Sequence, residues 1–320
     1  MPPPNHERLY VDLIFRSSRK YPNWDPEVTI QVGDYGRITQ GKRGLKFWMK
    51  NRGTFLKEGN IYKEGLAKQY EIPEAVEHGA AATEGITWIT SKNARDISVE
   101  ANVAEQTPAL VECGVKAAFK FTSGRGAVLA MNNDTISTID PPGKLRHLLA
   151  EPTMKGLVIV SEVHRCSSYA RFLSTQNGVT VALGLSAEPP IANVGKVGTD
   201  VRWVHSSSAG NFKAKVDKTG KRVFCPLFRL VALVDDDVAS GLRGEMDQDP
   251  PLPDALPPWD PIEDAMEQEE GDLTASPEEG TLPIGEKKYT FRRLSGAQRM
   301  YEEASDSHGN LADHQDEFED

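Results

Sequence analysis

The sequence predicts a β-rich body that begins with a helix and is followed by a largely disordered acidic tail. Between Ala109 and Thr122, apolar side chains occupy every odd position, and polar or small side chains occupy the even positions apart from Leu110. Such alternation is typical of a strand with one buried and one hydrated face. The pattern recurs at 97–104 and at 179–186, and the composition changes after residue 244. These observations indicate a sheet-based fold with a separate tail.

Charge divides the chain at the same place. Residues 245–320 hold 22 acidic and 5 basic residues, a net charge of −17, whereas residues 1–244 hold 25 acidic and 32 basic residues, a net charge of +7. A basic body is expected to seek anions. The acidic tail can either screen that surface or serve only to keep the chain soluble.

The composition favours a cytoplasmic protein. No apolar run reaches the roughly 18 residues of a membrane-spanning helix, and the N-terminal MPPPNHERLY lacks the apolar core of a signal peptide. The three cysteines, Cys113, Cys166 and Cys225, are scattered and form no CxxC pair, which fits a reducing compartment. The 320 residues suffice for one large domain or two small ones.

The first 80 residues predict a helix, a strand and a loop region. Glu7–Arg19 carries apolar side chains at helical spacing. Val28–Val32 alternates as a strand and ends at Gly33–Gly36, where two glycines indicate a turn. Leu66–His78 is polar and interrupted by a proline, so we expect a loop and a short helix there.

The segment Arg37–Lys57 is rich in basic and aromatic residues and contains no acid. Each Lys or Arg near an anionic membrane contributes about 1 kcal/mol to binding, and Trp sits well among lipid headgroups. The same combination of basic and aromatic residues would also suit binding to single-stranded nucleic acid. Alternatively, the segment is a solvated hairpin tip whose aromatic side chains face the core. The candidate lipid-binding residues are Arg37, Lys42, Arg43, Lys46, Phe47, Trp48, Lys50, Arg52 and Lys57.

Turn residues divide the alternating region into two hairpin-like units. In the first unit, Ser123–Gly126 predicts a turn before the apolar run Ala127–Met131. In the second, the β-branched run Leu157–Val163 is followed by Asn177–Gly178, which is a strong hairpin signal.

The rest of the body is predicted as short elements. Gly143–Glu151 is expected to be a short helix between the two hairpin-like units. Val201–Val204 and Asn211–Val216 predict short strands, and Val223–Val234 predicts a final apolar strand in which Pro226 indicates an edge or a bulge.

The tail is predicted as a Pro-rich acidic linker over 241–288 and a short C-terminal segment over 289–320. Residues 245–286 contain eight prolines and a single aromatic residue, Trp259, which is typical of a disordered or extended chain. Ser295 and Gln298 have the spacing of a capping box, so one short helix carrying Met300 and Tyr301 is expected.

Catalytic patterns are sparse, and we expect neither an enzyme nor a cofactor or metal site. The histidines show no HxxxH or HExxH spacing. His164 and Cys166 share a strand face without an orienting group, which argues against a nucleophilic dyad. Ser123–Gly126 lacks the GxxxxGK[ST] pattern that cradles phosphate.

Four short stretches together resemble the gasdermins. They are VGDYG at 32–36, FLKEGNIY at 55–62, KGLVIVSEV at 155–163 and PLFRL at 226–230, within roughly residues 5–235. The resemblance is closest to the short fungal members that act in heterokaryon incompatibility and regulated cell death. It implies an α+β fold with a twisted antiparallel sheet, peripheral helices and a pore-forming domain over residues 1–240.

The resemblance also implies a mechanism. Proteolytic removal of the C-terminal segment would release a cytoplasmic body that binds acidic phospholipids, forms homo-oligomers and inserts two β-hairpins into the cell membrane. The hairpins would map onto about Ile97–Met131 and Leu157–Leu185. Glu112, Lys116 and Lys120 would then face the water-filled lumen. The lipid-facing candidates are Val99, Ala101, Val103, Val111, Val115, Phe119, Phe121, Val158, Val160, Val179, Val181 and Leu183.

Three features depart from the family. The tail is shorter than the folded inhibitory domain of animal gasdermins, so its inhibition is expected to be weaker and partly electrostatic. No cysteine precedes Cys113, whereas bacterial members use an acylated N-terminal cysteine. The activating cut is not assigned. Arg243, Lys287, Arg292 and Arg293 suit a protease specific for basic residues, and Leu252 or Leu282 suits a less selective one.

Two alternatives to a pore remain from the residues alone. One is a soluble β-rich interaction protein whose acidic tail recruits a basic partner. The other is nucleic-acid binding through the basic stretch, with the tail as a competitor. The pore is our first interpretation, and it involves no nucleic acid.

Overall fold

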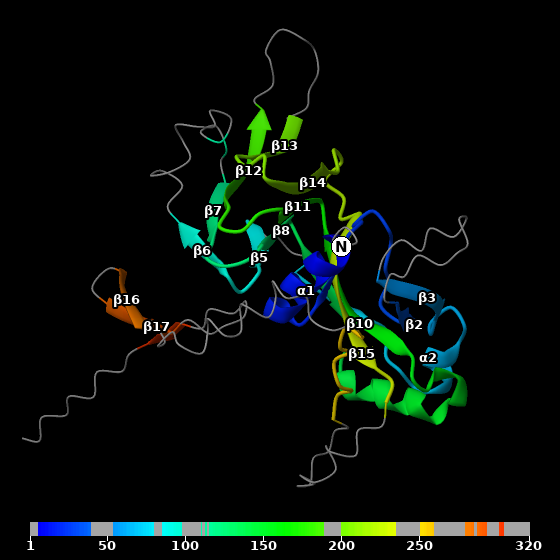
Figure 1. Ribbon diagram of the computed structural model, residues 1–320. Helices are drawn as coiled ribbons and strands as arrows, with labels where there is room; N and C mark the ends of the chain where they lie inside the picture. The colour runs from blue at the N-terminus through cyan, green and yellow to red at the C-terminus, as the bar shows by residue number, and fades with distance from the viewer. Residues whose placement is uncertain are drawn as a thin grey trace, which may run out of the picture.

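The computed structural model describes residues 6–39, 54–79, 85–97, 110, 113, 115–188, 200–234, 250–258, 279–284, 287–292 and 301–303. Within these residues the strands form four sheets, called A to D here, and the strand pairings are antiparallel (Figure 1). The protein is therefore an α+β protein with mostly antiparallel sheets and few helices, as predicted.

The elements are assigned to the sheets as follows. Sheet A contains β1 (Tyr21–Pro22), β2 (Asp34–Ile38), β3 (Phe55–Asn60), β4 (Val76–His78), β9 (Thr135–Thr138), β10 (Val158–Cys166) and β15 (Phe224–Ala232). Sheet B contains β5 (Ile86–Thr90), β8 (Ala127–Asn132), β11 (Ser168–Ser174) and β14 (Gly210–Val216). Sheet C contains β6 (Ala94–Ile97), β7 (Val115–Phe121), β12 (Thr180–Glu188) and β13 (Asp200–His205). The helices are α1 (His6–Ser18), α2 (Leu66–Gln69) and the 3₁₀ helices η1 (Pro142–Ala150) and η2 (Pro152–Met154).

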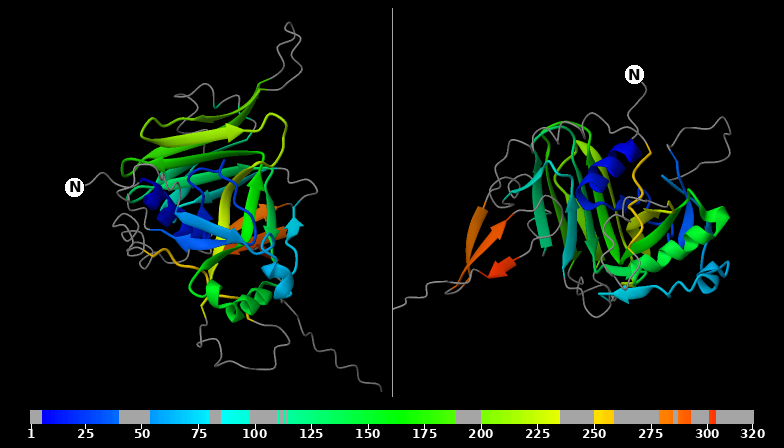
Figure 2. Two further views of the ribbon diagram at one scale, coloured as in Figure 1. Left: turned by 90° about the vertical axis from the view of Figure 1, so that its right-hand side faces the viewer. Right: turned by 90° about the horizontal axis from the view of Figure 1, so that it is seen from below.

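Helix α1 confirms the predicted N-terminal helix and lies between two sheets (Figure 2). Leu9 and Leu13 belong to the hydrophobic core against sheet B. Val11 and Phe15 face the other way, into the core of sheet A. The helix is apolar on two sides because both sides are covered. Arg19 then adopts a left-handed conformation with φ of 59°, and the helix ends there.

Sheets B and C form a two-layer sandwich. Phe121 of β7 and Phe172 of β11 stack across the layers, with ring centroids 6.3 Å apart and planes 6° apart. Trp88 of β5 contacts Phe119 of β7 at 5.6 Å and Trp203 of β13 at 6.1 Å between ring centroids. The dry interior of this sandwich explains the strict alternation along β7 and β12.

Both predicted turns cross between the layers. Asn177–Gly178 joins β11 of sheet B to β12 of sheet C, and these strands do not pair with each other. The hairpin prediction for this dipeptide is therefore wrong. Gly178 does adopt a positive φ of 69°, but a turn signal reports local geometry and not the partner that each strand selects. Ser123–Gly126 likewise joins β7 to β8 across the layers, and a Cβ on Gly126 would lie 1.9 Å from the Phe121 ring.

Strand β10 is the centre of sheet A. It pairs with β15 on one side and with β2 and β9 on the other. Ser167 separates β10 from β11, so the chain passes directly from sheet A into sheet B. Helix η1 packs Leu145 and Leu148 into the core of sheet A and confirms the short helix predicted at Gly143–Glu151.

Two predicted strands differ from the structure. Val28–Val32 is irregular, and strand β2 begins afterwards at Asp34. Ile30 and Val32 are buried all the same, so core contacts of an irregular segment produced the alternation. In Ala109–Thr122 the strand covers only Val115–Phe121, and Leu110 is helical.

The later strands were predicted correctly. Strands β13, β14 and β15 lie where the sequence placed them. Pro226 lies at a register irregularity, where the β15 partner of β10 jumps from Leu227 to Phe224. Pro226 therefore marks a bulge in an interior strand, since β15 lies between β1 and β10.

Residues 250–258, which the sequence placed in the disordered linker, pack on the body as an extended strap. Leu252 and Ala255 are buried in the core of sheet A. The amide of Ala232 donates to the carbonyl of Pro253 (2.9 Å), and the amide of Ala255 donates to that of Leu230 (2.9 Å). The strap thus adds to β15 and belongs to the folded body.

Sheet D lies further along the tail. It contains β16 (Glu279–Ile284), β17 (Lys287–Arg292) and β18 (Tyr301–Glu303). Tyr301, predicted on a short helix, lies on a strand instead. The prediction of a largely disordered tail is not confirmed for these residues.

Candidate functional site

Sheet C consists of two adjacent β-hairpins whose connections leave the sheet at the same end. Strand β6 pairs with β7, and β12 pairs with β13. Strands β7 and β12 also pair, with Val115 opposite Leu185 and Lys120 opposite Thr180. Strand β7 therefore starts where β12 ends. The connections 98–114 and 189–199 both extend from that end of the sheet.

One face of sheet C is apolar. Phe119 and Phe121 of β7 and Val181 and Leu183 of β12 are 0–3% exposed and lie in the core shared with sheet B. Trp203 of β13 is also buried there, against Ala130 and Ala170 of sheet B. The large apolar residues of β7 and β12 thus share one face of sheet C with Trp203.

The opposite face carries polar, charged and small side chains together with the apolar Ile97 and Val204. Lys120 lies opposite both Arg95 and Thr180, and Ser186 lies opposite Arg202. Part of this face is covered, because Leu110 and Cys113 pack on Ala118 and Ala182. A Cβ on Gly184 would lie 2.7 Å from Cys113 Sγ, so a glycine there makes room for the covering segment. Leu110 breaks the sequence alternation because it packs on this outer face.

The structure brings together only some of the predicted lipid-facing residues. Phe119, Phe121, Val179, Val181 and Leu183 gather in the sandwich core. Val115 begins β7. Val158 and Val160 lie elsewhere, in the core of sheet A. The remaining four, Val99, Ala101, Val103 and Val111, lie outside the described residues.

In this structure, neither predicted membrane-hairpin range forms a single hairpin, and the ranges stay a prediction for the inserted state. Ile97–Met131 runs through β7 of sheet C into β8 of sheet B, and Leu157–Leu185 runs through all three sheets of the body. The second hairpin is instead β12 with β13. Sequence reasoning had identified β13 only as a short strand. Val201 and Trp203 on either side of Arg202 were a weak signal for this strand, because Val204 breaks the alternation.

The basic stretch Arg37–Lys57 forms the connecting end of the β2–β3 hairpin. The amide of Thr39 donates to the carbonyl of Thr54 (2.8 Å), which closes the hairpin around residues 40–53. Arg37 and Lys57 lie on its strands. The other predicted lipid-binding residues, Lys42, Arg43, Lys46, Phe47, Trp48, Lys50 and Arg52, lie outside the described residues.

A buried carboxylate anchors the base of this hairpin. Asp34 is 0% exposed and accepts hydrogen bonds from the Gln31 amide (2.9 Å) and Asn60 Nδ2 (2.7 Å). Lys57 Nζ lies 2.6 Å from its Oδ1. Arg37 pairs with Glu58 at 2.9 Å in a more exposed setting. Arg37 and Lys57 are therefore both paired with acidic residues at the base of the hairpin. The connection 40–53 is the remaining candidate for lipid binding in this stretch.

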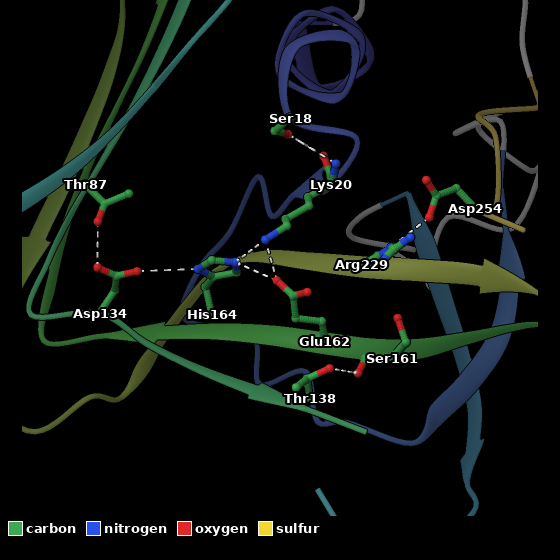
Figure 3. Close-up of polar contacts among 10 residues, drawn as sticks. All are labelled: Ser18, Lys20, Thr87, Asp134, Thr138, Ser161, Glu162, His164, Arg229 and Asp254. Carbon is green, nitrogen blue, oxygen red and sulfur yellow. Dashed lines mark hydrogen bonds and ion pairs between the residues drawn. The ribbon is translucent and has the colours of Figure 1, made fainter. Parts of the chain in front are cut away.

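A second polar cluster joins sheets A and B beneath α1 (Figure 3). His164 of β10 is 5% exposed, and its Nδ1 lies 3.4 Å from Asp134 Oδ2. Its Nε2 lies 2.9 Å from both Glu162 Oε1 and Lys20 Nζ. Lys20 also pairs with Glu162, and Thr87 of β5 donates to Asp134 (2.8 Å). The cluster thus connects four separate segments of the chain.

The cluster lowers the pKa of both carboxylates. Burial raises the pKa of Glu162, but hydrogen bonds from His164 and Lys20 outweigh burial and bring it to about 2. Burial opposes ionisation of Asp134 as well, and hydrogen bonds with His164 and Thr87 lower its pKa. Both groups are therefore charged near neutral pH, and Glu162 forms an ion pair with Lys20.

The residues that could serve as a nucleophile or as metal ligands have the following settings in the described part of the chain. Burial raises the pKa of the Cys166 thiol, so this cysteine is held in its unreactive form. Among the described residues, no group of three or more His, Cys, Asp or Glu side chains could hold a metal ion. The described helices include none of the length and apolarity needed to cross a membrane.

The candidate cleavage residues have different settings. Leu252 is 4% exposed beneath the strap backbone, so a protease would reach it only after the strap detaches. Lys287 and Arg292 lie on β17, and Leu282 lies on β16. Arg243 and Arg293 lie outside the described residues.

Comparisons with known proteins do not assign the chain to a family. Its sequence matches no model of a protein family. It also matches no curated protein.

Proposed function

We propose that this protein is a pore-forming executioner of regulated cell death, as its resemblance to the gasdermins implies. The observation that carries the proposal is sheet C. It contains two adjacent hairpins with an apolar face toward sheet B, a more polar outer face and both connections at one end. Strands that cross a membrane need this alternation of lipid-facing and water-facing side chains.

Strand length supports the proposal. Strand β12 spans nine residues, which approaches the roughly 9–11 residues of a membrane-crossing strand. In the connection 98–114, Val99, Ala101 and Val103 continue the alternation that Ile97 begins. Ile97 packs on the outer face of sheet C beside Ala118 and Ala182, so these residues would face lipid only if β6 changes its register on β7 during insertion. Longer strands can therefore form from the sheet and its connections together.

Insertion requires sheet C to leave sheet B. The apolar face of sheet C would exchange the sandwich interior for lipid, which keeps it out of water. Val128 and Phe172 of sheet B would lose their cover. Pairing with neighbouring subunits and burial in lipid would have to offset that cost. The tail would keep the body in the closed state until proteolysis.

Acidic phospholipids would be bound first, through the basic connection 40–53 of the β2–β3 hairpin. That connection carries Lys42, Arg43, Lys46 and Lys50 next to Phe47 and Trp48. Basic and aromatic side chains together favour an anionic headgroup layer.

A second candidate function is a soluble interaction protein whose acidic tail recruits a basic partner. The observation in its favour is that sheet B already covers the apolar face of sheet C. In that case the alternation of apolar and polar residues in the strands of sheet C would serve only to pack them against sheet B.

Dye release from liposomes containing anionic lipid tests the proposal. A protease site placed after Pro258 lets the tail be cut while the strap stays on the body. We expect leakage only after the cut and only with anionic lipid. If neither the cut nor the intact protein releases dye, although both bind the vesicles, the pore is excluded and the interaction protein is favoured.

A further inference from the structure

A small pocket lies where the strap crosses the edge of sheet A. Its volume is about 120 Å³. Strand β10 contributes Ser161, β15 contributes Arg229 and Val231, and the strap contributes Pro251 and Leu252. The remaining lining residues are Thr138, Ile139, Asp140, Pro142 and Leu145. The pocket is thus shared between the body and the strap.

Ser161 places a hydroxyl without a partner in this pocket. The residue is 6% exposed, and its Oγ is buried without a hydrogen-bond partner in the described part of the protein. Its carbonyl, by contrast, accepts from the amide of Ile139 (3.2 Å) and from Thr138 Oγ1 (3.4 Å). Buried hydroxyls are nearly always bonded, so this one indicates a missing acceptor.

Arg229 supplies a second donor. Its Nε donates to Asp254 Oδ1 of the strap at 2.7 Å (Figure 3). Within the described residues, its side chain makes no other hydrogen bond or ion pair. A guanidinium has five N–H donors, and two carboxylates can occupy different edges of it. The edge formed by the two Nη atoms is therefore available to an acceptor.

The remaining lining selects the kind of acceptor. Ile139, Leu145, Val231 and Leu252 are apolar and buried, which favours a ligand with an aliphatic body. Asp254 already neutralises part of the Arg229 charge. A single negative charge is thus better accommodated than the higher charge of phosphate.

We propose that this pocket binds a small branched aliphatic carboxylate. The carboxylate accepts from the Arg229 Nη edge and from Ser161 Oγ–H, and the aliphatic part lies against Leu145 and Leu252. Because Leu252 belongs to the strap, the bound ligand holds the strap on the body. This inference goes beyond the proposed function and does not depend on pore formation.

Isobutyrate binding to the full chain tests the inference. Hydrogen–deuterium exchange reports the protection of residues 250–258 during a titration. We expect isobutyrate to increase that protection with a Kd on the order of 1–10 mM, as suits a ligand of about six non-hydrogen atoms. The neutral isostere isobutyramide should bind at least about tenfold more weakly, because it lacks the charge that Arg229 pairs.

Ser161→Ala is the decisive variant. It removes a hydroxyl that has no partner in the described structure, so the fold should persist while isobutyrate binds about tenfold more weakly. Ser168→Ala is the matched control, since Ser168 Oγ is also buried without a described partner but lies on β11, outside the pocket. Unchanged strap protection at 100 mM isobutyrate, or equal binding by wild type and Ser161→Ala, would show that the pocket holds only water.

Discussion

At the scale of single residues, the cluster around His164 shows how buried polar groups satisfy one another. Lys20 Nζ lies 2.9 Å from His164 Nε2. The same Nε2 lies 2.9 Å from Glu162 Oε1, and Lys20 also pairs with Glu162. On the other side of the ring, Nδ1 lies 3.4 Å from Asp134 Oδ2. One imidazole is therefore flanked by two carboxylates, and Glu162 is the carboxylate that meets both the ring and the ammonium group.

Glu162 provides a test of this cluster at acidic pH. Its pKa falls from 4.5 to about 2 in the folded protein. A carboxylate with a lowered folded pKa stabilises the fold above its unfolded pKa and loses that contribution as the pH falls. We expect Glu162→Gln to cost on the order of 3 kcal/mol at pH 7. The difference from wild type should shrink as the pH falls from about 4.5 toward 2.

Urea unfolding of the two proteins between pH 7 and about pH 2 measures this difference. Glu58→Gln is the matched control. Its partner Arg37 has a side chain 67% exposed, and exposed ion pairs contribute about 0–1 kcal/mol. A constant stability difference between wild type and Glu162→Gln across this pH range would contradict the role assigned to the carboxylate.

At the scale of elements, the sequence predicted strands better than it predicted their partners. Alternation identified β7 and β12 because each has one face in the sandwich core. It could not show that Asn177–Gly178 crosses between layers, since strand pairing depends on segments distant in the chain. Strand β13, which pairs with β12 in the second hairpin of sheet C, is separated from β12 in the sequence by the connection 189–199. The strap was missed for a related reason: two buried apolar residues among prolines produce no period.

Phe172 tests whether sheet C must separate from sheet B. It is fully buried, lies on β11 and stacks on Phe121 of sheet C. Phe172→Ala should destabilise the protein by about 3–5 kcal/mol, as truncation of a buried Phe usually does. If sheet C separates during insertion, the cut variant should release dye faster than the cut wild type, because less burial has to be undone.

Phe228→Ala is the matched control for this variant. Phe228 is 2% exposed but belongs to the core of sheet A, away from the B–C interface. It should lower stability by a similar amount, as thermal unfolding will show, without faster leakage. Equal acceleration by both variants would mean that general unfolding, and not separation of the two sheets, controls leakage.

At the scale of the whole molecule, charge is divided between body and tail. The net charge is +7 over residues 1–244 and −17 over residues 245–320. Such opposite charges attract within one chain, and salt weakens the attraction: the Debye length falls from about 10 Å at 0.1 M to 3 Å at 1 M. Residues 250–258 are held on the body by buried contacts, so only the part of the tail after the strap can compete with lipid for the basic surface.

Vesicle binding measures the competition between tail and lipid. The protein cut after Pro258 should bind anionic vesicles more tightly than the full chain at low salt, and the two affinities should converge as salt rises. The quadruple variant Lys42/Arg43/Lys46/Lys50→Glu should weaken binding of the cut body by about 100-fold or more, since each basic residue contributes about 1 kcal/mol. The control reverses four exposed lysines outside the connection 40–53, Lys63, Lys68, Lys155 and Lys221. Both variants change the net charge by the same amount. Equal losses of vesicle affinity would therefore mean that overall charge controls binding, and that the basic connection of the β2–β3 hairpin is not the lipid-binding site.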